Sequence, residues 1–157
     1  MQAQAQDSIR AFRFGFLSYE KALKSMPDYA LVQASVDSMR SQYEAELKRV
    51  EQDFNMKYEE FLEGQRDFPM TILRKRQTEL KDLLERNVSF KSKSQQEIKD
   101  AETEAMAPLR EKLDAILAKI CLESGYAFIL NTDAGAVPII NPAMGDDITQ
   151  IVIDAFQ

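Results

Sequence analysis

Residues 32–61, VQASVDSMRSQYEAELKRVEQDFNMKYEEF, decide the fold of this chain of 157 residues. Apolar residues return every three or four positions without a break, which places them along one face of a helix. The stripe consists of Val32, Val36, Met39, Tyr43, Leu47, Val50, Phe54, Tyr58 and Phe61. Val32, Tyr43 and Phe54 are each eleven residues apart, a repeat typical of helices that pair nearly straight or with a slight right-handed twist. The pattern predicts a long helix that needs a partner along its whole length.

The following segment supplies that partner. Gly64 and the sequence Asp67-Phe68-Pro69 interrupt the helical pattern, because a proline inside a helix removes one N–H and clashes with the preceding turn. We therefore expect a turn at about residues 64–70 and a second helix from about residue 70 to residue 124. The apolar residues that mark this second helix include Leu80, Leu84 and Val88. Gly125 suits the left-handed position that ends a helix. The two helices are predicted to pair as an antiparallel hairpin.

One level of this hairpin is poor in apolar residues. Lys91–Glu97 (KSKSQQE) is expected opposite about Tyr43–Leu47, and it offers little apolar surface to the first helix. We expect few contacts between the helices there, and we expect bending to concentrate at that level.

Strand-like runs flank the hairpin on both sides. Residues 10–19 alternate so that three phenylalanines share one side, which predicts a strand with one strongly apolar face. Residues 126–131 (YAFILN) and 137–141 (VPIIN) predict two further strands, joined as a β-hairpin by a short connection. The three phenylalanines are Phe12, Phe14 and Phe16.

Short helical segments are expected beside these strands. Residues 20–26 allow one or two helical turns before Pro27, whose fixed φ and missing N–H suit the first position of the long helix. After residue 145 a closing helix begins, with Asp146 or Asp147 able to cap its N-terminus.

The predicted fold class is α+β. Residues 1–27 and 109–157 form a small β body of about three strands with a short C-terminal helix, and residues 28–108 form a long antiparallel helical hairpin arm. These elements cannot cover all of their own apolar faces, so we expect chains to share the body in an oligomer. The residues predicted to form this oligomer body are Phe12, Phe14, Phe16, Phe128, Leu130 and Ile139.

Charge balance and missing residue types exclude several classes of function. With 20 Lys and Arg against 26 Asp and Glu, the net charge is −6, whereas a general nucleic-acid binder needs a surplus of basic side chains. The chain has no histidine, which excludes histidine-based catalysis, and it has none of the glycine-rich phosphate-binding or nucleophile motifs. We expect no enzymatic activity, no cofactor, no metal ion and no nucleic-acid partner.

Around the turn the charge changes sign. Five basic residues stand there against two acidic ones, Asp67 and Glu79. The basic residues are Arg66, Arg74, Lys75, Arg76 and Lys81. They are either ordinary solubilising charge or a contact for an anionic surface, which is worth ~1 kcal/mol per basic residue at an anionic membrane. The candidates for such a contact are Arg66, Arg74, Lys75 and Arg76.

Several apolar residues fall off the main stripe or in the turn, where a simple hairpin leaves them exposed. They are Met56, Leu62, Phe68, Met70, Leu83 and Phe90. Met and Phe make adaptable apolar contacts, which suits binding of varied partners. The alternative is that these residues pack in a wider seam or in an oligomer interface. The candidates for binding a client protein are Met56, Leu62, Phe68, Met70 and Phe90.

Taken together, the order and spacing of these elements resemble the Skp/OmpH family of periplasmic chaperones over nearly the whole chain. No single motif is specific by itself. The stretches that carry the resemblance are Phe14–Tyr19 (FGFLSY) with Leu23, Met26–Tyr29 (MPDY), the paired helices, Gly125–Asn131 (GYAFILN), and Asn141-Pro142 through Asp147-Ile148-Thr149.

The resemblance implies a homotrimer in which strands from three chains form the body and three helical hairpins extend from it. Unfolded outer-membrane proteins are then held between the arms and kept from aggregating without nucleotide. The resemblance also implies a periplasmic location and a cleaved signal peptide. Residues 1–6 (MQAQAQ) fit the remainder of such a peptide and an ordinary start about equally well.

One departure from the family concerns charge. Its best-known members are strongly basic, whereas this chain is acidic overall. Client capture should therefore depend more on many weak apolar contacts, whose avidity comes from a high effective concentration. Two alternatives remain: a prefoldin-like holdase, which the order of strands and helices disfavours, and a structural or scaffolding oligomer with one fixed partner.

Overall fold

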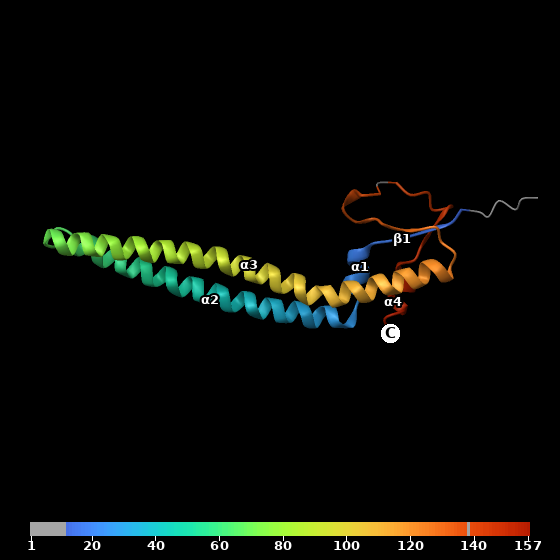
Figure 1. Cartoon of the computed structure of the whole chain (residues 1–157), viewed down its shortest axis with the longest axis horizontal. Coiled ribbons are helices and arrows are strands. Elements are labelled where there is room, and N and C mark those ends of the chain that lie inside the picture. Colours follow the sequence, from blue (N-terminus) through green and yellow to red (C-terminus); the bar gives the residue numbers. More distant parts are fainter. Residues whose placement is uncertain (1–11, 138) are drawn as a thin grey trace, which may run out of the picture. The chain divides into compact units, whose positions relative to one another are not determined.

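The computed structural model describes residues 12–137 and 139–157, so the predictions for residues 1–6 and for the start of the first strand lie outside the described residues. Two long helices and one small sheet make up most of it (Figure 1). In chain order the elements are β1 (Phe14–Leu17), α1 (Tyr19–Lys24), α2 (Pro27–Gly64), α3 (Met70–Glu123), β2 (Ile129–Asn131), the 3₁₀ turn η1 (Asp133–Gly135), β3 (Gly145–Asp147) and α4 (Thr149–Asp154).

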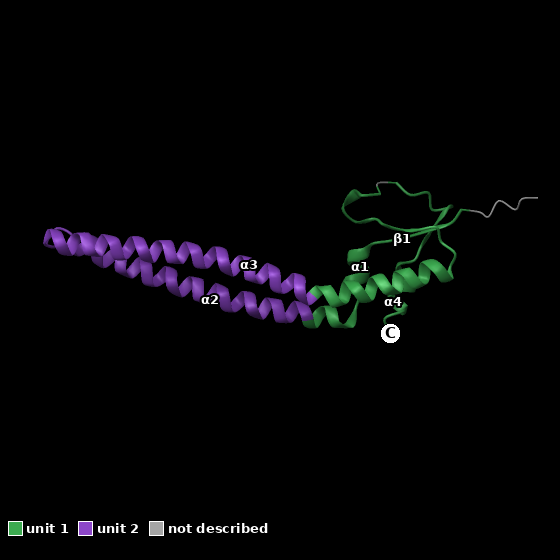
Figure 2. Cartoon of the chain, in the orientation of Figure 1, with its two compact units in different colours: residues 1–31, 106–157 green, residues 32–105 purple. Residues whose placement is uncertain are grey.

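The chain divides into two compact units (Figure 2). We call residues 1–31 and 106–157 the body unit and residues 32–105 the arm unit. The α+β fold class, with a helical hairpin, a three-stranded sheet and a short C-terminal helix, is confirmed. No helix in the described ranges has an apolar stretch that could span a lipid bilayer.

Both long helices begin and end close to the predicted positions. Pro27 is the first residue of α2, where its missing N–H costs no hydrogen bond. The C-terminal end of α3 is closed by Gly125, which adopts φ +68°. The N–H of Tyr126 donates to the carbonyl of Cys121 at 3.0 Å and the N–H of Gly125 to that of Leu122 at 3.3 Å, the hydrogen-bond pair that satisfies the last carbonyls of a helix.

The predicted β-hairpin near the C-terminus is wrong. β1 lies in the middle of the sheet, and β2 and β3 pair with its two edges, both in parallel. The third strand is β3 and not the predicted run 137–141. That run contains Pro138 and precedes Pro142, and a proline cannot donate to a strand ladder. Both edges of β1 are already occupied by β2 and β3.

The short first strand buries the face opposite its phenylalanines. Gly15 and Leu17 are buried, whereas Phe14 and Phe16 are half-buried. Gly145 lets the Phe14 ring lie directly on β3, because a Cβ at Gly145 would be 2.4 Å from the ring. The core beneath the sheet is built from β1, α1, α3 and α4. It contains Leu17, Ala22, Leu23, Met26, Leu109, Leu113, Ile120, Ile148 and Val152.

Two neighbouring carboxylates of β3, Asp146 and Asp147, have different hydrogen-bond partners. Asp146 accepts hydrogen bonds from Arg13 at 2.5 Å and from the Tyr126 hydroxyl at 2.9 Å, so it is not the cap of the closing helix. Asp147 accepts from the N–H of Thr149 at 3.0 Å, two residues further on. Of the two predicted capping residues, only Asp147 therefore satisfies a backbone donor at the start of α4.

Asp133 holds the N-terminus of α1. One of its carboxylate oxygens accepts from the Ser18 hydroxyl at 2.6 Å, and the other accepts from the N–H of Glu20 at 2.7 Å. Ser18 in turn accepts from the N–H of Lys21 at 3.2 Å. The Ser18 hydrogen bond, followed by the Glu20 N–H, holds the pKa of Asp133 below its ordinary value. The turn after β2 thereby satisfies donors that α1 cannot satisfy itself.

Substituting Asp133→Asn should make the body unit less sensitive to acid. Because the pKa of Asp133 is lowered in the folded chain, its contribution is present above the ordinary value of 3.8 and is lost as the pH falls through the lowered value. Urea unfolding at pH 7 and at pH 3 should show the variant less stable at pH 7, with a smaller difference at pH 3. A difference that grows on acidification would contradict this.

Leu113 and Leu122 on α3 form a matched pair, because Leu113 is 0 % exposed and Leu122 is 84 % exposed. We expect Leu113→Ala to lower the free energy of unfolding by about 2–5 kcal/mol, since it leaves a cavity in the core. Leu122→Ala should change it by less than about 0.5 kcal/mol if the residue faces water. Urea titration measures both; a near-neutral Leu113→Ala would contradict the described core, and a large loss at Leu122 would mean that another molecule covers it.

Candidate functional site

The arm unit is a pair of helices joined along an apolar seam. Its best-covered apolar residues are Val36 on α2 and Ile98 on α3, which are buried. Further toward the turn the apolar side chains of the seam are half-buried or exposed. Two helices alone therefore leave much of the apolar stripe in partial contact with solvent.

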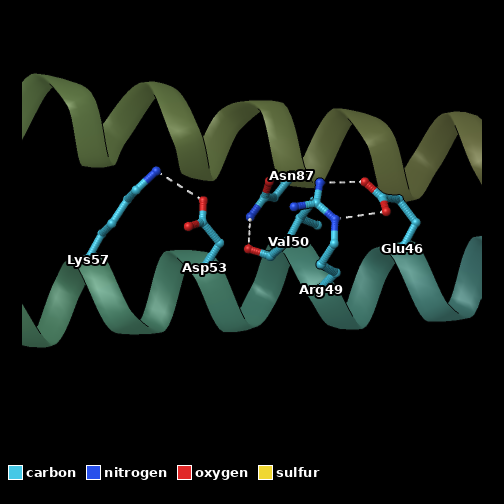
Figure 3. Close-up of polar contacts among 6 residues, drawn as sticks. All are labelled: Glu46, Arg49, Val50, Asp53, Lys57 and Asn87. Carbon is cyan, nitrogen blue, oxygen red and sulfur yellow. Dashed lines mark hydrogen bonds and ion pairs between the residues drawn. The ribbon is translucent and has the colours of Figure 1, made fainter.

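Polar contacts fix how the two helices lie against each other. The side-chain amide of Asn87 on α3 donates to the carbonyl of Val50 on α2 at 3.1 Å (Figure 3). By contrast, Arg49 with Glu46 at 2.6 Å and Lys57 with Asp53 at 3.0 Å are ion pairs along α2 itself. Only the Asn87 contact in this group resists sliding of one helix along the other.

The level at Tyr43 is better packed than predicted. The Tyr43 ring centroid lies 6.0 Å from that of Phe90, and the Tyr43 hydroxyl donates to Glu97. Ser94, in the polar run, is 1 % exposed, and its hydroxyl donates to the carbonyl of Phe90. The expectation of few contacts at this level is wrong because a small side chain allows close approach and its hydroxyl is satisfied within its own helix. The predicted bending stays a prediction.

The five candidate client-binding residues fall into two groups. Met56, Leu62 and Met70 are exposed, with 60 %, 43 % and 61 % of their surface accessible. Phe90 packs on Tyr43, and Phe68 lies over Gly64, where an added Cβ would be 2.5 Å from the phenylalanine ring. The first group is available for binding, whereas the second builds the arm itself.

The sequence pattern missed four exposed apolar residues of the arm unit. They are Tyr58, Ile72, Leu84 and Val88. Tyr58, Leu84 and Val88 follow the helical spacing and were therefore expected in the seam. Periodicity shows which residues share a helix face, but it does not show how much of that face one partner helix can cover.

Two of the hollows on the arm unit are lined by residues of both long helices. The mid-arm groove has a volume of about 300 Å³ and is lined by apolar side chains of both helices, among them Leu47, Val50, Phe54, Leu84 and Val88. The tip pocket has a volume of about 310 Å³. Its apolar lining is Phe61, Phe68, Leu80 and Leu83. Its charged lining is Lys57, Arg76 and Arg86 together with Glu60, Glu79 and Asp82.

All four residues predicted to contact an anionic surface are exposed near the turn. Lys75 and Arg76 share the carboxylate of Glu79, at 3.8 Å and 3.9 Å. Within residues 12–137 and 139–157, neither Arg66 nor Arg74 forms an ion pair within 4.0 Å. The anionic-surface contact stays a prediction.

The predicted oligomer-body residues leave apolar surface open on the body unit. Phe12, Phe128 and Ile139 are exposed, Ile139 by 88 %, and Phe14, Phe16 and Leu130 are half-buried. The ring centroid of Phe128 lies 5.4 Å from that of Phe12 and 5.8 Å from that of Phe14, so these rings form one aromatic cluster. Four exposed apolar residues in the described part of the body unit were not predicted: Leu31, Leu122, Met144 and Ile151.

Alanine substitutions should separate the two groups of candidate client-binding residues. Phe90→Ala removes the contact with Tyr43, and we expect it to lower the free energy of unfolding by about 1–3 kcal/mol. Met56→Ala is the matched control, expected within about 0.5 kcal/mol of the unchanged protein because Met56 makes little contact. Chemical denaturation followed by circular dichroism measures both. Equal effects would contradict the division.

Comparison with known proteins agrees with this architecture. Residues 13–156 match the family described as Outer membrane protein (OmpH-like). The structure is similar to a crystal structure of an OmpH-like protein from Caulobacter crescentus CB15, named as an outer membrane chaperone, with a TM-score of 0.72 and 19 % identity over 91 % of this chain and 82 % of that one. Comparison with curated proteins gives no match. The chain therefore belongs to the OmpH-like family.

Proposed function

We propose that the protein is an ATP-independent holdase chaperone of the periplasm, which binds unfolded outer-membrane proteins between the arms of a homotrimer. The observation that carries this proposal is the exposed apolar surface on both helices of the arm unit. Met56 and Leu62 on α2 and Met70, Leu84 and Val88 on α3 are all more than two-fifths accessible. OmpH-like family membership supports the same role.

Such a surface suits reversible binding of unfolded chains. Each exposed side chain gains free energy when a client covers it, at roughly 25 cal/mol for each Å² of apolar surface removed from water. The contacts are scattered among charged residues, so no single one holds the client. Several arms around one client raise the effective concentration of these weak sites, which gives retention without nucleotide.

Open apolar surface on the body unit supports association of copies. The cluster of Phe12, Phe14 and Phe128 and the exposed Ile139 offer apolar surface that a second copy can cover. A body shared by three chains would cover such residues and bring three arms together. At the turn, Arg66, Arg74, Lys75 and Arg76 would meet an anionic membrane surface, and salt would weaken that contact.

Replacing Met56, Leu62 and Met70 together by Ser should weaken client protection. A loss of ~1 kcal/mol at each of the three sites would weaken binding about a hundredfold. The matched control is Gln52, Gln65 and Gln77 replaced together by Ser, because these exposed residues of the same region are already polar. Light scattering after diluting a urea-unfolded outer-membrane protein into each variant measures protection, and the mass of the variant alone verifies assembly.

Undiminished protection by the triple variant would show that these residues are not the binding surface. A panel of unrelated unfolded proteins tests the function itself. Retention of many of them supports a holdase, whereas retention of one partner only would favour the scaffold. A monomeric mass for the unchanged protein would exclude the trimer.

A further inference from the structure

We propose that the tip pocket is a subsite for one aromatic side chain of an extended client segment. This inference rests on the proposed holdase function, and it names the kind of residue that the arm selects. Three observations carry it: the apolar lining, the balanced charges of the rim, and the dependence of one wall on a glycine.

The lining of the pocket comes from three consecutive parts of the arm unit. Phe61 stands on α2, Leu80 and Leu83 stand on α3, and Phe68 comes from the turn between them. All four are half-buried, so each still has surface to offer. Two aromatic rings among four apolar side chains favour another ring, which can pack edge-to-face or offset against them.

Gly64 sets the position of the Phe68 wall. A Cβ built on Gly64 would lie 2.5, 2.9 and 3.1 Å from three atoms of the Phe68 ring. Any other residue at position 64 would therefore push the ring away from the helix. The shape of the pocket thus depends on Gly64, although Gly64 itself does not line the pocket.

The rim carries equal numbers of opposite charges, three basic and three acidic. The carboxylates would repel a strongly anionic ligand, and the basic side chains would repel a strongly cationic one. The rim therefore favours neither. Glu60, Asp82 and Arg86 form no ion pair within 4.0 Å in the described part of the chain. The two carboxylates can accept hydrogen bonds from backbone N–H groups of an extended segment, and Arg86 can donate to its C=O groups. In an unfolded chain these backbone groups have no partner except water.

The volume and the rim together point to the occupant. About 310 Å³ is at the lower end of the ~300–1,000 Å³ typical of ligand pockets, which suits one large side chain with its adjoining backbone. Strands of outer-membrane barrels alternate apolar and polar residues and carry aromatic residues at both ends of the apolar band. One such aromatic residue can enter the pocket while its polar neighbours lie at the charged rim.

A peptide assay tests the subsite directly, because the protein has no tryptophan and a single peptide tryptophan can be followed alone. The probe is a ten-residue peptide of alternating apolar and polar residues with tryptophan at one apolar position. Its fluorescence should shift to shorter wavelength on binding. The same peptide with leucine in place of tryptophan should compete at least fivefold less well.

Variants locate the site. Leu83→Ser should weaken peptide binding about tenfold, and the control Gln77→Ser, at an exposed polar position of α3 outside the pocket lining, should leave it unchanged. Gly64→Ala should weaken peptide binding at least threefold, because it displaces the Phe68 ring. Alanine favours a helix more than glycine does, so this variant should fold. It therefore tests the subsite even if Leu83→Ser does not fold.

Several outcomes would overturn the inference. Equal binding by all variants, loss of binding with Gln77→Ser alone, or equal competition by the leucine peptide would each remove the aromatic subsite. A lower oligomer mass for Leu83→Ser would assign the pocket to contact between copies. If the peptide does not bind but the unchanged protein still protects unfolded clients, the subsite is wrong and the proposed function stands; if protection also fails, the proposed function is wrong.

Discussion

The sheet of the body unit depends on one four-residue strand that is shared by two neighbours. β2 pairs with one edge of β1 and β3 with the other, both in parallel. Parallel strands cannot be joined by a tight turn, because the chain has to return along the sheet before it enters again in the same direction. Between β1 and β2 this return is made by α1, α2 and α3. The long hairpin is thus the crossover connection of a very small sheet.

This arrangement explains which parts of the fold were predictable. The signals for the hairpin are local: an eleven-residue repeat from Val32 onward, Gly64 and Pro69 at the turn, and Gly125 after α3. The signals for the sheet are not local. β2 and β3 are three residues long each, and alternation over three residues says nothing about partner or direction. A β-hairpin was the simplest pairing of neighbours in sequence, and the central position of β1 overrode it.

The candidate site was predictable in kind and less so in detail. Met56, Leu62 and Met70 were expected off the seam and are exposed. Phe90 was also expected off the seam, yet its ring packs against Tyr43. The polar run of α3 allows this packing because its small residue Ser94 is buried in the seam. Leu84 and Val88 show the opposite outcome, because they were expected in the seam and are exposed. Whether an apolar residue of a two-helix arm is covered depends on the shape of its neighbours, which a single sequence does not contain.

The pairing of Gly15 with Ile129 also sets an order of events when the chain folds. Bringing strands together across most of a chain costs loop-closure entropy that increases with the length of open chain. The hairpin shortens that length, because its contacts near the turn are close in sequence and can spread outward from it. The easiest route therefore begins at the turn and finishes with the sheet. On this route a newly made molecule has its helical hairpin before it has its sheet.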